Sequence, residues 1–414
     1  MKIVEPRIAV DAIPDHSIAI VPGGCASATA FYTALMDSVE RFDALTLCCG
    51  FSFGDYPFLQ RGLGEHTRYL TWQASPRVRS LFKENDPKKI AYVPIRLADV
   101  HRVIGASGEI RPHTVVVQTS VPQDGKEVSL GISVGPYLDF VRSAKLVIAE
   151  FNVNMPVTHG DCRIPLDAID YAYEADTPII EYRTPPAQES DLSIVDHVMS
   201  LIPDGAWVQL GIGSVPDRIM LQLKHVPGIK LWSGLLTGGL QDFIEGSAGQ
   251  AEIVAGELAG DRSFYEFCND HRGIRMAPTS VTHDVSRVAA LPNFVSINSA
   301  LEVDLQGQTN GEAIGAVQIS GVGGALDYME AAALSPGGVS VTAMPSVTAD
   351  GKRSKIVARF PAGGVVTAPR YCTDYVVTEY GIARLRGRDL HQRAEALIAI
   401  AHPEFRDELA EAWR

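Results

Sequence analysis

Asn298-Ser-Ala-Leu-Glu-Val-Asp-Leu-Gln-Gly-Gln308 and the glycine cluster Ser320-Gly-Val-Gly-Gly324 decide how this chain is interpreted. An apolar run from Phe294 to Leu301 predicts a strand that leads into the polar part of the first stretch. The small residues of the second stretch then let a ligand approach the backbone closely. We interpret the two stretches as the floor of an active site. The alternative is a buried strand followed by a tight structural loop.

Composition limits the class of protein. The chain has 414 residues, of which 46% are hydrophobic and 21% charged, as is usual for a globular enzyme of two or three domains. Its formal net charge of −13 argues against nucleic acid or an anionic membrane as the main partner. An acidic protein that binds an anionic ligand must gather its few positive groups locally. The six cysteines form no CxxC pair, so we expect neither a disulfide scaffold nor a metal site.

The N-terminal residues bear on location. Residues 1–7 carry charge and proline where a signal peptide would need an apolar run, and no apolar run approaches the roughly 18 residues of a membrane span. We therefore expect a soluble cytoplasmic protein. We also expect a homo-oligomer, namely a dimer.

The first half of the chain alternates short apolar runs with glycine turns and longer mixed segments. Strands are predicted at residues 18–21, 44–48, 90–93, 115–117 and 146–149, and Asp124-Gly125 marks a turn between two further strand-like pieces. Strands that end in glycine and lead into helical patterns are typical of βαβ units around a parallel sheet. We predict an α/β domain over residues 1–190, which ends in a linker rich in proline and polar residues.

The second half repeats this rhythm, and we predict a second α/β domain over residues 191–414. It opens with a helix over residues 191–202 that has Asp191 as its N-cap. Further strands are predicted at residues 207–210, 295–298, 339–342, 356–359 and 375–378, and a last helix at residues 392–400.

A glycine turn follows the first strand of this second domain. Gly211 and Gly213 precede a helix whose first turn contains Pro216 and Asp217, so helix amides there are candidates to bind a phosphate or carboxylate. The pattern resembles the start of a dinucleotide fingerprint. A full G-x-G-x-x-G is missing, which argues against nicotinamide binding.

Motifs in the second half resemble the acetyl-CoA hydrolase/transferase family, and within it the 4-hydroxybutyrate CoA-transferase type. They are residues 298–308, Ser320-Gly-Val-Gly-Gly-Ala-Leu-Asp327, Val377-Thr-Glu-Tyr-Gly-Ile-Ala-Arg-Leu-Arg-Gly387 and Ala401-His-Pro-Glu-Phe-Arg406. The first half is similar, less tightly, at residues 159–161 and 169–178. The resemblance implies two CoA-transferase-type α/β domains with the active site at their interface. It also implies an acyl-CoA substrate, with coenzyme A as part of that substrate and no tightly bound cofactor.

The resemblance assigns roles to several residues. Gly323 and Gly324 are expected to supply backbone N–H groups to the thioester oxygen. Acyl transfer develops negative charge on that oxygen, and each pre-aimed donor typically contributes a factor of about 100 or more in rate. In the substrate and CoA site we place Gly211, Gly213, Gly234, Asn298, Glu302, Gln308 and Gly321.

The chain departs from the family at the position of the nucleophile. The family uses a glutamate that attacks the acyl-CoA, forming an acyl-glutamyl anhydride and then a glutamyl-CoA thioester. The matching segment here reads Ile229-Lys-Leu-Trp-Ser-Gly-Leu-Leu-Thr-Gly-Gly-Leu240, with Gly234 in the place of the glutamate. Either the covalent exchange is lost, or a different carboxylate has taken it over.

Glu257 is the candidate replacement. It lies in Val254-Ala-Gly-Glu-Leu-Ala-Gly260, an otherwise small and apolar strand. A carboxylate there would be desolvated, with a raised pKa suited to general-base catalysis. The alternative is that Glu257 faces solvent or pairs with Arg262.

Several other polar residues are weaker candidates, and for most of them a structural role is the alternative. Glu302 and Asp304 could form a paired carboxylate site, or one of them could brace the loop; Glu379 is a further acidic candidate. His159 could act across the domain interface, His283 lies beside Asp284, and Cys25 could be a nucleophile at a helix start. Arg384, Arg386 and Arg388 could contact CoA phosphates or form a solvated basic face.

From these residues we expect an acyl-CoA-utilising enzyme that hydrolyses the thioester or a C–C bond of a CoA-linked acyl group, with water activated by Glu257. One alternative is a CoA-transferase that moves CoA between carboxylic acids through a relocated carboxylate. The other is a non-catalytic acyl-CoA-binding protein.

Overall fold

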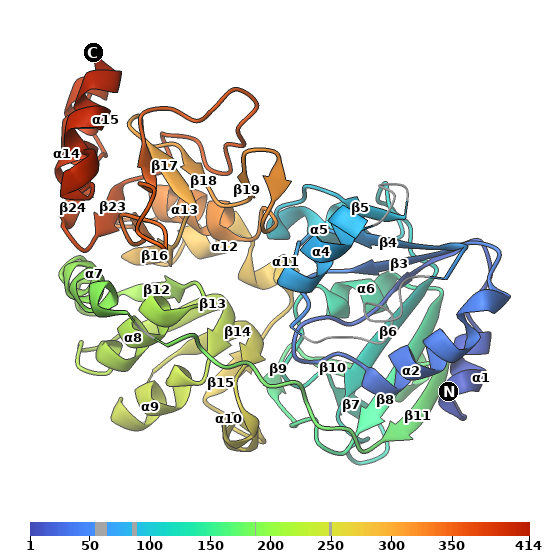
Figure 1. The fold of residues 1–414 in the computed structure, drawn as a ribbon. Helices are drawn as coiled ribbons and strands as arrows, with labels where there is room; N and C mark the ends of the chain where they lie inside the picture. Colours follow the sequence, from blue (N-terminus) through green and yellow to red (C-terminus); the bar gives the residue numbers. More distant parts are fainter. Residues whose placement is uncertain (54–63, 85–88, 187, 248–250) are drawn as a thin grey trace. The chain divides into compact units, whose positions relative to one another are not determined.

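The chain folds into two compact units. A computed structural model describes residues 1–53, 64–84, 89–186, 188–247 and 251–414 (Figure 1). Unit 1 consists of Met1–Arg183 and Val254–Thr282, and unit 2 of Thr184–Ile253 and His283–Arg414. Both units are α/β, as predicted. The segment that carries Glu257 packs with unit 1, so the units are not two continuous halves of the chain, and the domain division at residue 190 stays a prediction.

Unit 1 is built on an eight-stranded parallel sheet in the order β1-β11-β8-β6-β2-β3-β4-β5 (Figure 1). The strands are β1 (Lys2–Ile3), β2 (Ser17–Ile20), β3 (Leu45–Cys49), β4 (Thr67–Thr71), β5 (Ile90–Tyr92), β6 (Thr114–Thr119), β8 (Leu146–Asn152) and β11 (Tyr171–Ala175). In addition, β7 (Glu127–Ser129) pairs with β10 (Arg163–Pro165), β9 (His159–Gly160) pairs with β15 (Ile274–Met276), and nearly all of β14 (Ile253–Ala259) belongs to this unit.

The helices of unit 1 supply part of its buried core. They are α1 (Pro6–Asp11), α2 (Thr29–Ser38), α4 (Pro76–Glu84), α5 (Leu97–Val103), α6 (Tyr137–Ser143), α10 (Arg262–Cys268) and α11 (Thr279–Thr282), with 3-10 turns at Val39–Arg41 and Leu166–Ala168. Val10 of α1 and Phe31 of α2 belong to the same buried cluster as Val116 and Ile148 of the sheet. Every residue of β6 and β8 is buried, which is why these strands have continuous apolar runs instead of alternation.

Unit 2 is a second sheet, with strand order β24-β23-β21-β16-β12-β13, in which only β24 is antiparallel to its neighbour. These strands are β12 (Trp207–Leu210), β13 (Lys230–Thr237), β16 (Phe294–Asn298), β21 (Val339–Ala343), β23 (Tyr375–Thr378) and β24 (Gly381–Arg384). Short strands β17 (Glu302–Asp304), β18 (Thr309–Asn310) and β22 (Ile356–Val357) form a separate sheet, and β19 (Ala313–Ile314) pairs with β20 (Val317–Gln318).

The helices of unit 2 are α7 (Glu189–Met199), α8 (Ser214–Leu223), α9 (Gly239–Gly246), α12 (Val285–Ala289), α13 (Ala325–Leu334), α14 (Leu390–Ala399) and α15 (Arg406–Trp413), with a 3-10 turn at Pro403–Phe405. In the sheet, β13 lies on one side of β12 and β16 on the other. The strand order therefore reverses between β12 and β16. In open α/β sheets, ligands bind outside the carboxyl ends of the strands at such a reversal.

The predicted strands are confirmed with shifted ends, and one helix start was wrong. Asp191 is not the N-cap of α7, because the helix begins earlier, at Glu189. The Asp191 carboxylate lies in the first turn and accepts the backbone N–H of Gln188 at 3.0 Å. That bond satisfies an amide at the helix start, as in a capping box. Within the described part of the chain, no helix is long and apolar enough to cross a bilayer.

Candidate active site

The glycine cluster forms the start of α13 in unit 2. Gly324 is the N-cap residue of this helix, and Gly323 has a φ of +67°. A Cβ built on Gly323 would meet no atom within 4 Å. Glycine is therefore required here for its left-handed conformation and not by crowding, and the space beside it is open. The amides of this loop belong to a helix N-terminus, where partial positive charge favours an anion.

Gly234 lies in the middle of β13, in a space too small for a side chain. A Cβ at this position would lie 2.5 Å from Cε1 and 2.7 Å from Nε2 of His283, and 3.3 Å from the Tyr328 hydroxyl oxygen. Real Cβ contacts are not this short, so any larger residue at 234 requires His283 to move.

His283 fills the space beside Gly234. It is buried, and its ring centroid lies 4.8 Å from that of Tyr328, which is on the first turns of α13. Burial lowers the pKa of His283 to about 3, so the imidazole is neutral near pH 7. Tyr328 thus connects this cluster to the helix that begins with the glycine loop. From the sequence, His283 was only a weak candidate, since no local pattern indicates contact with Gly234.

A second part of unit 2 lies where β12 and β16 end. The Asn298 side-chain amide donates to the side-chain Oε1 of Gln209 at 2.9 Å and to the Ser296 hydroxyl at 2.9 Å. The Gln209 side-chain amide donates to Oδ1 of Asn298 at 3.2 Å. A Cβ on Gly211 would lie 3.7 Å from the side-chain Oδ1 of Asn298. This network fixes the orientation of Asn298 beside the glycine turn.

A cavity of about 420 Å³ opens at this point. Gly213, Ser214 and Val215 at the start of α8 line it, together with Asn298 and Lys355. The cavity lies at the reversal of strand order, and its size is within the usual range for small-molecule sites. Of the predicted ligand-site residues, the structure brings Gly213 and Asn298 together here, with Gly211 adjacent.

Asp304 and Gln308 stabilise the turn that follows β17. The buried Asp304 carboxylate accepts the backbone N–H groups of Gln306 at 3.0 Å and Gln308 at 2.9 Å, and the Gln308 side-chain amide at 2.6 Å. The loop-brace alternative is thus confirmed for Asp304. Glu302 has a different partner, the Asn310 amide at 3.5 Å, so the two carboxylates do not form a pair.

Glu257 lies in unit 1, facing two glycine loops. A Cβ on Gly135 would be only 2.6 Å from one carboxylate oxygen of Glu257, and a Cβ on Gly24 would be 3.5 Å from the other. Ser133 forms a β-bridge with Glu257, and the N–H groups of residues 134 and 135 both donate to Gly256 O at 3.1 Å. Glycines at positions 24 and 135 therefore let two loops close over the carboxylate.

This environment perturbs the acid. Burial raises the pKa of Glu257 to about 7, and the Ser133 side chain opposes the rise. The side chain remains partly accessible. The expected alternative, a pair with Arg262, was wrong, because Arg262 Nε bonds Glu266 at 2.8 Å. Among the described residues, no cation lies within 4.0 Å of Glu257. A carboxyl group that is close to half-ionised at neutral pH is suited to accept a proton.

The remaining candidates have structural surroundings. Burial raises the pKa of the Cys25 thiol to about 12, which leaves it protonated and disfavours it as a nucleophile. His159 pairs with the exposed Asp270 at 2.6 Å, Glu379 accepts the Ser346 hydroxyl at 2.6 Å, and Arg386 pairs with the buried Asp374 at 2.7 Å.

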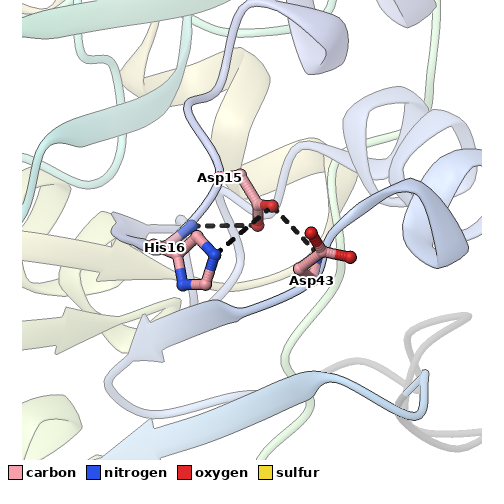
Figure 2. Close-up of side chains that lie close together, drawn as sticks. All are labelled: Asp15, His16 and Asp43. Carbon is pink, nitrogen blue, oxygen red and sulfur yellow. Dashed lines mark hydrogen bonds and ion pairs between the residues drawn. The ribbon is translucent and has the colours of Figure 1, made fainter.

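Asp15, His16 and Asp43 gather at the surface of unit 1 (Figure 2). Asp15 accepts the backbone N–H groups of His16 at 2.9 Å, Asp43 at 3.1 Å and Ala44 at 2.9 Å. These bonds lower the pKa of the Asp15 carboxyl, with that from Ala44 the largest contribution. The carboxylate thus joins two loops, and we assign the group no catalytic role.

The chain is similar in sequence to proteins of known family. The N-terminal domain profile of the acetyl-CoA hydrolase/transferase family matches residues 1–181, and its C-terminal domain profile matches residues 260–413. The 4-hydroxybutyrate coenzyme A transferase of Clostridium kluyveri is 32% identical over 421 residues, which cover 100% of this chain and 97% of that protein. An acetyl-CoA hydrolase of Candida albicans is 24% identical over 74% of this chain and 66% of its own length.

The fold has a close structural counterpart. The crystal structure of RipA from Yersinia pestis matches with a TM-score of 0.92 and 30% identity, over 99% of this chain and 96% of that one. This agreement and the full-length similarity to the Clostridium enzyme extend over both units. The chain therefore belongs to the acetyl-CoA hydrolase/transferase family.

Proposed function

We propose that this member of the family hydrolyses a CoA thioester and does not transfer CoA through an enzyme-bound glutamyl thioester. The observation that carries the proposal is at position 234, where the residue is glycine and His283 occupies the space a side chain would need. A glutamate nucleophile supplies both the attacking oxygen and the carboxyl that later holds CoA. Glycine supplies neither.

Glu257 is the proposed general base. Its carboxylate removes a proton from water while the water oxygen attacks the thioester carbonyl carbon. The C–S bond then breaks, the proton passes to the departing thiolate, and the products are a free carboxylic acid and CoA. Since burial raises the pKa of Glu257 to about 7, the carboxylate is basic enough to assist and is still substantially ionised at neutral pH.

Gly323 and Gly324 are the proposed donors to the thioester oxygen. That oxygen gains negative charge as water adds, and amides already fixed at the start of α13 stabilise it without reorganisation. The open space beside Gly323 supports this role, because an acyl group can approach the backbone there.

A second candidate function is CoA transfer with Glu257 as a relocated nucleophile. The sequence similarity to a CoA-transferase and the reactive carboxyl of Glu257 favour it. The two functions differ in the source of the oxygen atom that is added to the acyl group when the acid is released. Hydrolysis in ¹⁸O-labelled water places one label in the released acid and is independent of added acetate or other carboxylates.

The test is turnover of a panel of acyl-CoA substrates in labelled water, with and without a carboxylate acceptor. Thiol release and mass spectrometry of the acid are measured together. Label in the acid and a rate unaffected by the acceptor support hydrolysis. Acyl-CoA formed from the acceptor, in amounts that rise with acceptor concentration, contradicts it and supports transfer.

A further inference from the structure

A second cavity in unit 2, of about 460 Å³, has a basic wall. Lys352, Arg353, Ser354 and Lys355, here named the basic loop, lie along one side. Apolar groups from the chain's C-terminal helix and from β22 line other parts, among them Leu409, Ala412 and Ile356. A cavity that combines an apolar surface with several cations fits a ligand that has both an apolar part and negative charge.

Its own hydrogen bonds hold the basic loop in place. Thr348 N–H donates to Arg353 O at 2.9 Å, and Gly351 N–H donates to Thr348 O at 2.8 Å. The Asp350 carboxylate accepts the Thr348 hydroxyl at 2.6 Å and the Lys352 N–H at 3.2 Å. The turn is therefore preorganised, and its one carboxylate is engaged within it.

The three cations of the basic loop lack close acidic partners. In the residues that the structure describes, no carboxylate oxygen lies within 4.0 Å of the charged nitrogens of Lys352, Arg353 or Lys355. Glu302 and Glu408 also line the cavity. Burial lowers the pKa of Lys355 to about 8, while Glu379 and Glu302 oppose this, so Lys355 stays largely protonated near pH 7. Cations outnumber carboxylates on this wall, although the whole chain has a net charge of −13.

This cavity adjoins the one that contains Asn298. The two share Leu301, Ile314, Thr348 and Lys355 as lining residues. A ligand that extends from Asn298 along these shared residues would reach the basic loop. CoA has the matching order of chemistry: a neutral pantetheine arm, then phosphate groups, then an adenine ring.

We propose that the basic loop binds the phosphate groups at the nucleotide end of CoA. The inference rests on the proposed action on CoA thioesters. Arg353 offers a planar fork of donors for phosphate oxygens, and the two lysines add compact positive charge. The apolar lining contributed by Ile356, Leu409 and Ala412 receives the adenine ring. The site thereby gives an acidic protein the local positive charge that an anionic ligand needs.

The test is calorimetric binding of CoA, pantetheine and ADP to the full chain and to the variant Lys352→Ala/Arg353→Ala. Both residues are exposed, so neither substitution opens a core cavity. We expect CoA to bind roughly tenfold more weakly to the variant at low salt, with pantetheine affinity unchanged and the CoA difference shrinking as salt rises. The matched control is Arg384→Ala/Arg388→Ala, which removes the same charge from exposed positions outside the cavity.

Two results would overturn the assignment: unchanged CoA affinity in the basic-loop variant, or equal losses for CoA and pantetheine. A loss of CoA affinity in the control variant alone would move the phosphate site to the arginine cluster and also overturn it. Because CoA itself is the probe, no turnover is needed. If hydrolysis is absent but CoA affinity still depends on the basic loop, only the proposed reaction fails.

Discussion

Glu257 in unit 1 and Gly234 in unit 2 both depend on glycine to make room for an ionisable side chain, but the side chain is a carboxylate in one case and an imidazole in the other. Gly24 and Gly135 have no side chains that would collide with the Glu257 carboxylate, and burial raises the pKa of that carboxyl to about 7. At Gly234, the glycine itself makes room for an imidazole, and burial keeps that ring neutral. The first arrangement leaves an ionisable base. The second, at the position where we place the family's missing nucleophile, provides a group that carries no negative charge.

This difference bears on the choice between the two proposed reactions. A neutral histidine with a pKa of about 3 is a weak base and cannot form an acyl anhydride. A carboxyl with a pKa of about 7 is a good base for water. The comparison therefore favours hydrolysis, and the following substitutions test each side of it.

The largest effect is expected from Glu257→Gln. This change keeps the shape of the side chain and removes the proton acceptor, so kcat should fall by about 100-fold or more, as for other general bases. In the unmodified enzyme, kcat should rise with pH through about 7, because the base must be ionised. The matched control is Glu266→Gln, which alters an exposed ion pair of the same unit. Equal activity of the two variants would remove Glu257 from the mechanism.

Gly323→Ala should give the next largest effect. A side chain at a φ of +67° strains the backbone and shifts the amides that we propose as donors to the acyl oxygen, so we expect kcat to fall by roughly 10- to 100-fold. Gly363→Ala serves as the control, because Gly363 has a φ of +81° and open space around it. Similar thermal shifts with different kcat values are the expected outcome. Loss of activity in both variants would make the effect one of folding.

Gly234→Ala should mainly change stability. The added methyl would overlap His283, at a cost of about 1–3 kcal/mol in the free energy of unfolding. In a His283→Ala background the same change should cost less, with a coupling of roughly 1 kcal/mol in a double-mutant cycle measured by urea unfolding. Gly238→Ala, at a position with open space, is the control. Additive effects at 234 and 283 would show that the two positions are independent.

The pH dependence of stability should show an effect that does not involve turnover. The pKa of Glu257 rises from 4.5 to about 7 on folding, so the folded state holds a proton that the unfolded state has lost. The contribution of Glu257 to stability therefore falls as pH rises from about 4.5 to about 7. Relative to the unmodified chain, the Tm of Glu257→Gln should increase between pH 5 and pH 8. Parallel Tm curves over this range would mean that Glu257 has an ordinary pKa when folded.

Local patterns in the sequence predicted much of this structure. Apolar runs that end in glycine located the parallel strands, and a loop brace was one of the two roles expected for Glu302 or Asp304. The difference from the family's pattern at Gly234 predicted a missing nucleophile, and the apolar neighbours of Glu257 predicted its raised pKa. Each of these features depends on residues close together in the chain.

Contacts between distant segments could not be predicted. No sequence pattern predicts that His283 contacts Gly234, or that Gly24 and Gly135 contact Glu257. These contacts arise only when separate strands and loops pack together. The error at Asp191 is different in kind. Its carboxylate is as favourable within the first turn as at the N-cap, and composition alone does not separate the two positions.

The absence of a covalent glutamyl intermediate is most directly tested by intact-protein mass spectrometry. The enzyme is incubated with an acyl-CoA that it turns over and then treated with borohydride, which reduces a glutamyl-CoA thioester. We predict an unchanged protein mass while free acid and CoA accumulate. A stoichiometric mass change that maps to Glu257 or to any other carboxylate would contradict hydrolysis by activated water and establish a relocated nucleophile.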